Sequence, residues 1–259
     1  MIRQILTALP PALLLAAPLH ADISMTSTVS GGAMGKSMSG PSTIQIKGLK
    51  MRTEATVAGQ STVSILDVEA RQMIVLDTKK QVAEVFDMTQ LATVQQQIGM
   101  NDLQIDFKPT GDKREIAGFS CDGYHTEIRV KVDDPTGQGS QMQVVIGGPV
   151  WLAKDAPGKE EFANFYVAAA KAGLFFGNPE LAKAQPGREK AMTELQRAMA
   201  ETGLDCASEL NIGFEGEGMM AAIMKKMNVT ANSTLQSVSD APLSDDLFKV
   251  PAGWKVKKK

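Results

Sequence analysis

The sequence predicts an α+β protein in which an antiparallel sheet forms the core and helices pack on one of its faces. The central observation is the segment 116–132, in which the apolar residues from Tyr124 to Val132 all stand at even-numbered positions. Such alternation places one side of a strand against a core and the other side in water. Short alternating segments separated by turns fill most of the chain, and one helix-rich stretch at about 157–203 interrupts them.

Residues 1–21 have the pattern of a secretory signal peptide. A basic start at Arg3 precedes an apolar stretch, and the small residue Ala21 marks the expected cleavage site. The apolar stretch is too short to span a bilayer, and no cysteine follows the expected cut to accept a lipid. The mature chain is therefore expected to begin at Asp22, to be periplasmic, and to have no permanent membrane anchor.

The expected cleavage also limits the chemistry that remains. His20 leaves with the signal peptide, so His125 is the one histidine of the mature chain. This argues against a histidine-based zinc site and leaves one candidate for any Ser-His-Asp or Cys-His arrangement. The net charge of −2 becomes −3 without Arg3, so a nucleic-acid partner is not expected. The lysine-rich segment 255–259 is expected to be a solvated terminus.

Residues 22–87 are expected to form an antiparallel meander. Segments of ordinary strand length are separated by turns at Gly48, at Gly59 and at 77–80. A loop rich in Gly, Ser and Met is expected at 31–41. Consecutive strands should be neighbours in space. The expected strands are 23–29, 42–47, 49–59, 62–70 and two within 71–87.

The middle of the chain is expected to add a short helix and three more strands. Leu91, Val94 and Ile98 recur at helix spacing within 88–100. Strands are expected at 102–107, 116–132 and 141–155, with a turn at 108–112 and a loop at 133–140.

Two helices are expected within 157–203. Pro157 stands at a helix-start position, and aromatic residues recur at helix spacing after it through Lys171. The most regular amphipathic pattern is 188–202, with Gly203 as its stop signal. The apolar stripes of these helices need a cover, and the inner face of the sheet is the available partner. The last strands are expected at 204–214 and 229–239.

Three short motifs, in this order, resemble those of a known group of proteins. They are Ile-x-Gly-Phe-x-Cys at 116–121 followed by Tyr124, Trp-Leu-Ala-Lys-Asp at 151–155, and the ending Asp-Leu-Phe-Lys-Val-Pro-Ala-Gly-Trp at 246–254. The chain resembles an uncharacterised family of bacterial secreted proteins, which is similar to periplasmic lipoprotein-localisation factors and mycobacterial lipid-carrier lipoproteins. The resemblance covers most of 22–254.

This resemblance implies a single half-barrel domain at 22–259. In such a domain a curved antiparallel sheet is closed by helices on its concave side. The resemblance transfers no functional residue to this sequence, since one fold hosts many functions.

The two cysteines predict one disulfide between Cys121 and Cys206, because disulfides are typical of exported chains. Closing this loop would stabilise the fold by an amount on the order of 4 kcal/mol. Cys121 is out of phase with the apolar residues of its strand, so the bridge needs a bulge, which we expect at Gly123. The alternative is two separate thiols. A catalytic pair of Cys121 and His125 is not expected, because positions four apart on a strand lie roughly 13 Å from each other.

A cluster of methionines allows two further interpretations. Met219, Met220, Met224 and Met227 have helix spacing, and thioethers are soft ligands that Cu(I) prefers. The alternative is a flexible apolar connector that packs on the edge of the sheet. The lysines at 225–226 place positive charge beside the copper position, which favours the connector.

The leading hypothesis is an exported, non-enzymatic protein that carries a lipid or an acylated ligand in an apolar cavity, with no cofactor and no metal. The alternative is a structural or interaction protein that has a filled core and binds another envelope protein. A carrier needs roughly a few hundred Å³ of connected apolar space, and a filled core does not. The residues expected to line the cavity, which would otherwise be ordinary core, are Ile44, Ile46, Val144, Ile146, Phe162, Phe165 and Tyr166.

Overall fold

The computed structural model describes residues 22–33, 36–57, 59–97, 103–132, 142–175, 179, 186–216 and 229–259. The predicted signal peptide and the predicted methionine cluster lie outside the described residues. Within them, twelve strands form one open sheet. The strands are β1 (Ile23–Ala33), β2 (Lys36–Lys47), β3 (Lys50–Val57), β4 (Gln60–Asp67), β5 (Gln72–Asp77), β6 (Val82–Asp87), β7 (Leu103–Ile116), β8 (Phe119–Val132), β9 (Met142–Ala153), β10 (Leu204–Gly216), β11 (Val229–Ser239) and β12 (Lys255–Lys258).

The sheet consists of two antiparallel meanders. They are joined by the pairing of β1, the first strand of one, with β11, the last strand of the other. Strands β1 to β6 run outward in one direction, β11 to β7 run outward in the other, and β1 pairs with β11 at the junction. The predicted antiparallel sheet is therefore confirmed. Consecutive strands are neighbours with two exceptions: β6 and β7 lie on opposite sides of the junction, and β12 lies beside β6 rather than beside β11. At one edge β12 pairs with β6 in parallel, and β7 forms the other edge.

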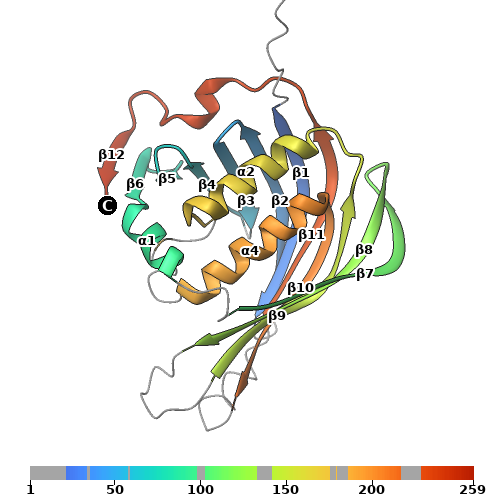
Figure 1. Ribbon diagram of the computed structural model, residues 1–259. Helices are drawn as coiled ribbons and strands as arrows, with labels where there is room; N and C mark the ends of the chain where they lie inside the picture. Colours follow the sequence, from blue (N-terminus) through green and yellow to red (C-terminus); the bar gives the residue numbers. More distant parts are fainter. Residues whose placement is uncertain are drawn as a thin grey trace, which may run out of the picture.

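Three α-helices and one short 3₁₀-helix accompany the sheet in the described part of the chain. The α-helices are α1 (Thr89–Gln97), α2 (Lys159–Ala172) and α4 (Pro186–Thr202), and the 3₁₀-helix is η2 (Asp245–Phe248). Figure 1 shows α2 and α4 running across one side of the sheet. Among the described residues, no helix is long and apolar enough to cross a membrane.

The segment 116–132 forms the strand that the alternation predicts. In β8, Tyr124, Ile128 and Val130 are buried, whereas His125 is exposed. On α4, Ala191 and Leu195 are four residues apart and belong to the same core cluster as these three β8 side chains. The apolar face of α4 and the apolar face of β8 therefore pack against each other in one layer.

Three segments that lack strong strand patterns are nevertheless strands. Most of the predicted loop 31–41 belongs to β1 and β2, because Gly31 and its neighbours pair with β11 as well as with β2. The predicted turn 108–112 lies inside β7. The lysine-rich segment predicted to be a solvated terminus forms β12, whose side chains are exposed although its backbone pairs with β6. In the first and third cases, pairing with a strand that is distant in sequence overrides weak local propensity. Within the second segment, residues 110–112 have no partner in the β7–β8 register.

The bulge that the disulfide requires is not in β8. β8 keeps a continuous register with β9 from Cys121 to Val132. The extra residue is Cys206 itself, because Asp205 and Ala207 of β10 pair with consecutive residues of β9. A second irregularity lies in β7, where three residues stand opposite Gly123. A Cβ at Gly123 would lie 2.8 Å from the Thr110 hydroxyl oxygen, so this glycine accommodates the bulge of its neighbour.

Candidate functional site

A continuous row of apolar side chains crosses β1 to β6. Each member lies directly opposite the next across a pair of strands, so all of them share one face of the sheet. All are buried in the same core cluster. This first row consists of Ile23, Ile46, Met51, Leu66, Met73 and Phe86.

A second row runs parallel to the first, two residues further along each strand. Residues two apart on a strand point to the same face, so this row shares the face of the first. Apart from Met25, which is buried, its members are half-buried, and the row mixes apolar residues with two hydroxyl side chains and, at its β6 end, one acid. The second row consists of Met25, Ile44, Thr53, Ser64, Val75 and Glu84.

The aromatic side chains of α2 belong to the same cluster as the first row. The ring of Tyr166 lies 4.6 Å from that of Phe162 and 5.6 Å from that of Phe165. Its hydroxyl lies 3.9 Å from the sulfur of Met51. Helix α2 and the first row therefore enclose an apolar layer that contains flexible methionine side chains as well as rings.

The structure brings five of the seven predicted lining residues together and separates the other two. Ile46, Phe162, Phe165 and Tyr166 share one cluster, and Ile44 packs against it. Val144 and Ile146 of β9 belong to a separate cluster with Ile212. The reason is strand order, because three strands stand between β2 and β9. The alternation along a strand shows which face of the sheet a residue lies on. It does not show which strands are the neighbours of that strand.

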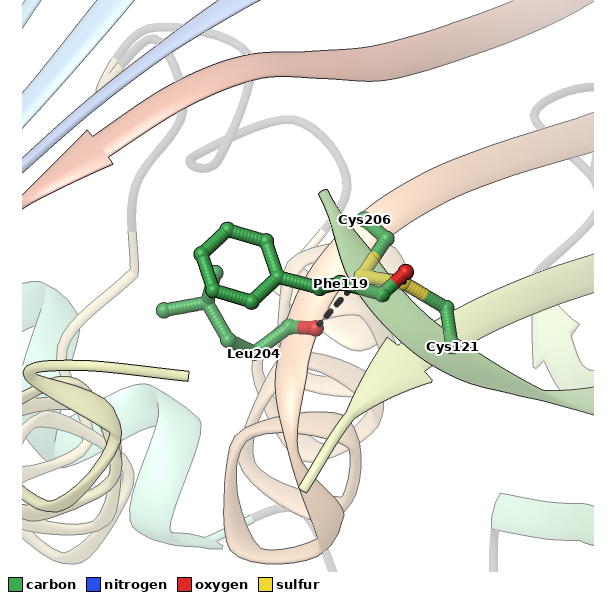
Figure 2. The surroundings of a disulfide bond; sticks show 4 residues. All are labelled: Phe119, Cys121, Leu204 and Cys206. Atoms are coloured by element: carbon green, nitrogen blue, oxygen red, sulfur yellow. Dashed lines mark hydrogen bonds between the residues drawn. A yellow bond between two sulfur atoms is a disulfide. The ribbon is translucent and has the colours of Figure 1, made fainter. Parts of the chain in front are cut away.

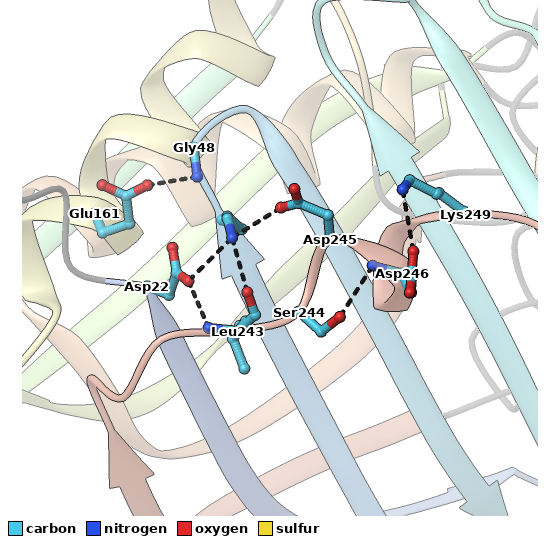
Figure 3. Close-up of polar contacts among 9 residues, drawn as sticks. Asp22, Gly48, Glu161, Leu243, Ser244, Asp245, Asp246 and Lys249 are labelled. Carbon is cyan, nitrogen blue, oxygen red and sulfur yellow. Dashed lines mark hydrogen bonds and ion pairs between the residues drawn. The ribbon is translucent and has the colours of Figure 1, made fainter.

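Local contacts hold the start of α2 against the β2–β3 turn. The backbone N–H of Gly48 donates to Glu161 Oε1 at 2.6 Å, as Figure 3 shows. Gly158, the N-cap of α2, has a φ of 71°, and a Cβ there would lie 2.9 Å from Ile23. Only glycine satisfies both conditions easily.

Polar contacts also attach the C-terminal segment to the first strands. Lys47 donates to the Leu243 carbonyl at 2.7 Å and forms an ion pair with Asp245 at 2.8 Å. The hydrogen bond to Asp245 raises the pKa of Lys47 above its usual value. The Leu243 N–H donates to Asp22 at 2.6 Å (Figure 3). Phe248 of η2 then covers the opposite face of β4 to β6, where it packs in a cluster with Ile65.

Asp205, a half-buried acid, was not identified from the sequence. Asp205 lies beside the disulfide, and its Oδ1 is buried with no hydrogen-bond partner among the described residues. Burial raises the pKa of Asp205 to about 7, and a hydrogen bond with Ser208 opposes part of that rise. Burial and the Asp205 charge also raise the pKa of Tyr166 above its usual value. The signal in the sequence was weak: a single acid between the apolar residues Leu204 and Cys206.

The predicted disulfide between Cys121 and Cys206 is present. It joins β8 to β10 where the strand between them, β9, ends at Ala153. Figure 2 shows the bridge with Phe119 and Leu204 beside it. Because Cys121 is bonded, no free thiol faces His125, and the described residues contain no group of three or more metal-ligating side chains.

Comparison with known proteins adds little to this description. No family model and no curated protein matches the chain. The solved structure of PNGF-II is 13% identical with a TM-score of 0.36, over 92% of this chain and 31% of that one, so this chain spans about a third of its length. A DUF1329 family protein from Desulfovibrio piger is 10% identical with a TM-score of 0.32, over 90% and 91% of the two chains. At such low TM-scores neither neighbour assigns a family or a function, and the resemblance to lipoprotein-localisation factors stays a prediction.

Proposed function

We propose that this protein is an exported, non-enzymatic binding protein that holds an acyl chain or a lipidated ligand between its sheet and helix α2. In this proposal the sheet is a half-barrel, and the helices cover its concave side. The ligand chain lies along the second row, beside the buried first row. The observation that carries the proposal is this pair of adjacent rows, one fully buried and one half-buried, on the same face.

The composition of the layer supports a site that changes shape around a ligand. Met25, Met51 and Met73 come from three different strands, and Met88 follows β6. Methionine is unbranched and flexible, so a methionine-rich layer repacks at low cost when an acyl chain enters. Burial of an acyl chain contributes about 0.8 kcal/mol for each methylene removed from water. The energy of binding would thus come from apolar contact rather than from specific polar groups.

The proposal is tested by binding of the neutral fluorescent probe N-phenyl-1-naphthylamine, with palmitate as the competitor. Ile44 is half-buried in the second row, and the variant Ile44→Glu places a charge in the path of the chain. We expect its affinity for the probe to fall by at least about tenfold, because an unpaired charge in an apolar site costs more than 1.4 kcal/mol.

The matched control is Ile74→Glu. Ile74 is also a half-buried isoleucine in the first meander, but it packs in the cluster on the opposite face of the sheet. This variant should bind the probe as the wild type does. Equal binding by both variants, or none by the wild type, would contradict the proposal.

A second candidate function is an interaction protein of the cell envelope with a filled core. The observation that favours it is the burial of the predicted lining residues: Ile46 and Phe165 are fully buried, and Tyr166 is 5% exposed. A protein of this kind would bind neither the probe nor palmitate, so the same titration separates the two candidates.

A further inference from the structure

A cleft of about 520 Å³ opens at the β12 edge of the sheet. Its volume lies within the range of small-ligand sites. Its lining combines hydroxyl groups, lysines, two acids and a short apolar floor. The lining residues that bear on its chemistry are Thr62, Val75, Asp77, Lys79, Lys80 and Lys257.

The cleft continues the second row. Val75 and Glu84 belong to that row and also line the cleft. Lys257 of β12 pairs with Glu84, so it extends the row by one strand. Val75 also packs against the cluster under α2. The cleft and the apolar layer are therefore contiguous on one face, with the charged end at the edge of the sheet.

The charged end has an excess of positive charge. Lys80 pairs with Asp77 at 2.8 Å, and Lys259 pairs with Glu84 at 3.7 Å. Within the described residues, neither Lys79 nor Lys257 has an ion-pair partner. Three lysines and two acids line the cleft. Two uncompensated ammonium groups thus face a cleft that also offers hydroxyl groups.

We propose that this cleft binds the anionic phosphate headgroup of a lipid whose acyl chain follows the second row toward α2. This inference rests on the proposed function and adds the class of ligand: a phosphate-bearing anionic lipid. Lysine ammonium groups bind phosphate as point charges, and hydroxyl groups such as that of Thr62 donate hydrogen bonds to phosphate oxygens. The acyl chain supplies the apolar contact, and the headgroup fixes its direction.

The test compares palmitoyl-lysophosphatidylglycerol, palmitoyl-lysophosphatidylcholine and glycerol 3-phosphate by isothermal titration against the full mature chain. The anionic lysolipid should bind more tightly than the zwitterionic one, and the preference should weaken as salt rises. In the variant Lys79→Gln/Lys257→Gln, affinity for the anionic lysolipid should fall about fivefold for each lysine removed. Binding of the neutral naphthylamine probe should not change in this variant.

The matched control is Lys131→Gln/Lys171→Gln, which removes the same charge from exposed positions outside the cleft. Its affinity for the anionic lysolipid should stay close to that of the wild type. Both double variants alter exposed side chains, and matching thermal unfolding curves would show that both fold.

The other outcomes are separable. Equal binding of the two lysolipids, unaffected by Lys79→Gln/Lys257→Gln, would overturn the headgroup site and leave the apolar layer intact. Binding of glycerol 3-phosphate that is lost in this variant, without binding of either lysolipid, would instead indicate a site for free phosphate and overturn the lipid ligand. Binding of neither lysolipids nor the neutral probe would overturn the proposed function itself.

Discussion

At the scale of the residue, Asp205 is a half-buried acid beside the disulfide. Its carboxylate has one buried oxygen without a hydrogen-bond partner among the described residues, and its pKa rises to about 7. An unfolded aspartate titrates near its ordinary value of about 3.9. The folded protein therefore retains a proton on Asp205 in a pH range where the unfolded chain has released it.

The first prediction concerns the pH dependence of stability. Because the raised pKa makes the folded state bind more protons, the stabilisation from this group is complete below about pH 4 and is lost as pH rises toward 7. The unfolding free energy of the wild type should thus fall between pH 5 and pH 7, by at most about 1.4 kcal/mol per pH unit from this group. Asp205→Asn should remove that contribution. Urea unfolding at several pH values measures it.

The control for this prediction is Asp87→Asn. Hydrogen bonds from Thr89 lower the pKa of Asp87, so it titrates below this range. This variant should retain the slope of the wild type between pH 5 and pH 7. Identical slopes for the wild type and Asp205→Asn would refute the assignment of Asp205.

Residue-scale prediction from the sequence succeeded where a pattern repeats and failed where a residue acts alone. The buried face of β8 followed from alternation, and the pairing of Cys121 with Cys206 followed from there being two cysteines in a chain that is expected to be exported. Asp205 belongs to no pattern, and its burial arises from the bulge at Cys206. A bulge consists of a single extra residue in a strand, and no repeating pattern in the sequence marks its position.

At the scale of the element, the disulfide joins two strands that each pair with β9. It closes a loop with a sequence separation of 85 residues, which contains β9, α2 and α4. The unfolded chain therefore loses conformational freedom over the whole helical part of the protein. Neither cysteine is exposed to water, so both are protected from exchange in the folded state.

The second prediction is the cost of removing this bridge. Cys121→Ala/Cys206→Ala should lower the unfolding free energy by an amount on the order of 4 kcal/mol, as the loop-closure model gives for a loop of this size. Denaturant unfolding with and without dithiothreitol measures it. The wild type should lose stability when reduced, whereas the double variant should not respond to the reductant. A wild type that unfolds identically in both conditions would contradict a bonded pair.

Element-scale prediction depended on the strength of the local pattern. The helix expected at 188–202 appears as α4, and the strands of the first meander appear where expected outside the segment 31–41. The glycine-rich end of β1 and the lysine-rich β12 have none, and they become strands because a neighbouring strand offers unpaired backbone groups. Such pairings join residues more than 170 positions apart, which no local window contains.

At the scale of the whole molecule, the first meander places side chains in two rows that cross its six strands. The first row is an apolar layer shared with α2, and the second leads from that layer to the basic cleft at β12. The face of each residue was predictable from parity, whereas the order of the strands was not. For this reason Ile46 and Phe165 share one cluster in the structure, whereas Val144 and Ile146 lie in another.

Native mass spectrometry of the protein, purified without detergent from cells that produce the full chain, shows directly whether it carries a lipid. We expect a species heavier than the polypeptide, and organic solvent should release from it an anionic lipid that tandem mass spectrometry identifies. A bare polypeptide mass in every preparation, together with failure to take up palmitoyl-lysophosphatidylglycerol added in excess, would rule out a lipid carrier and favour a filled-core protein that binds an envelope partner.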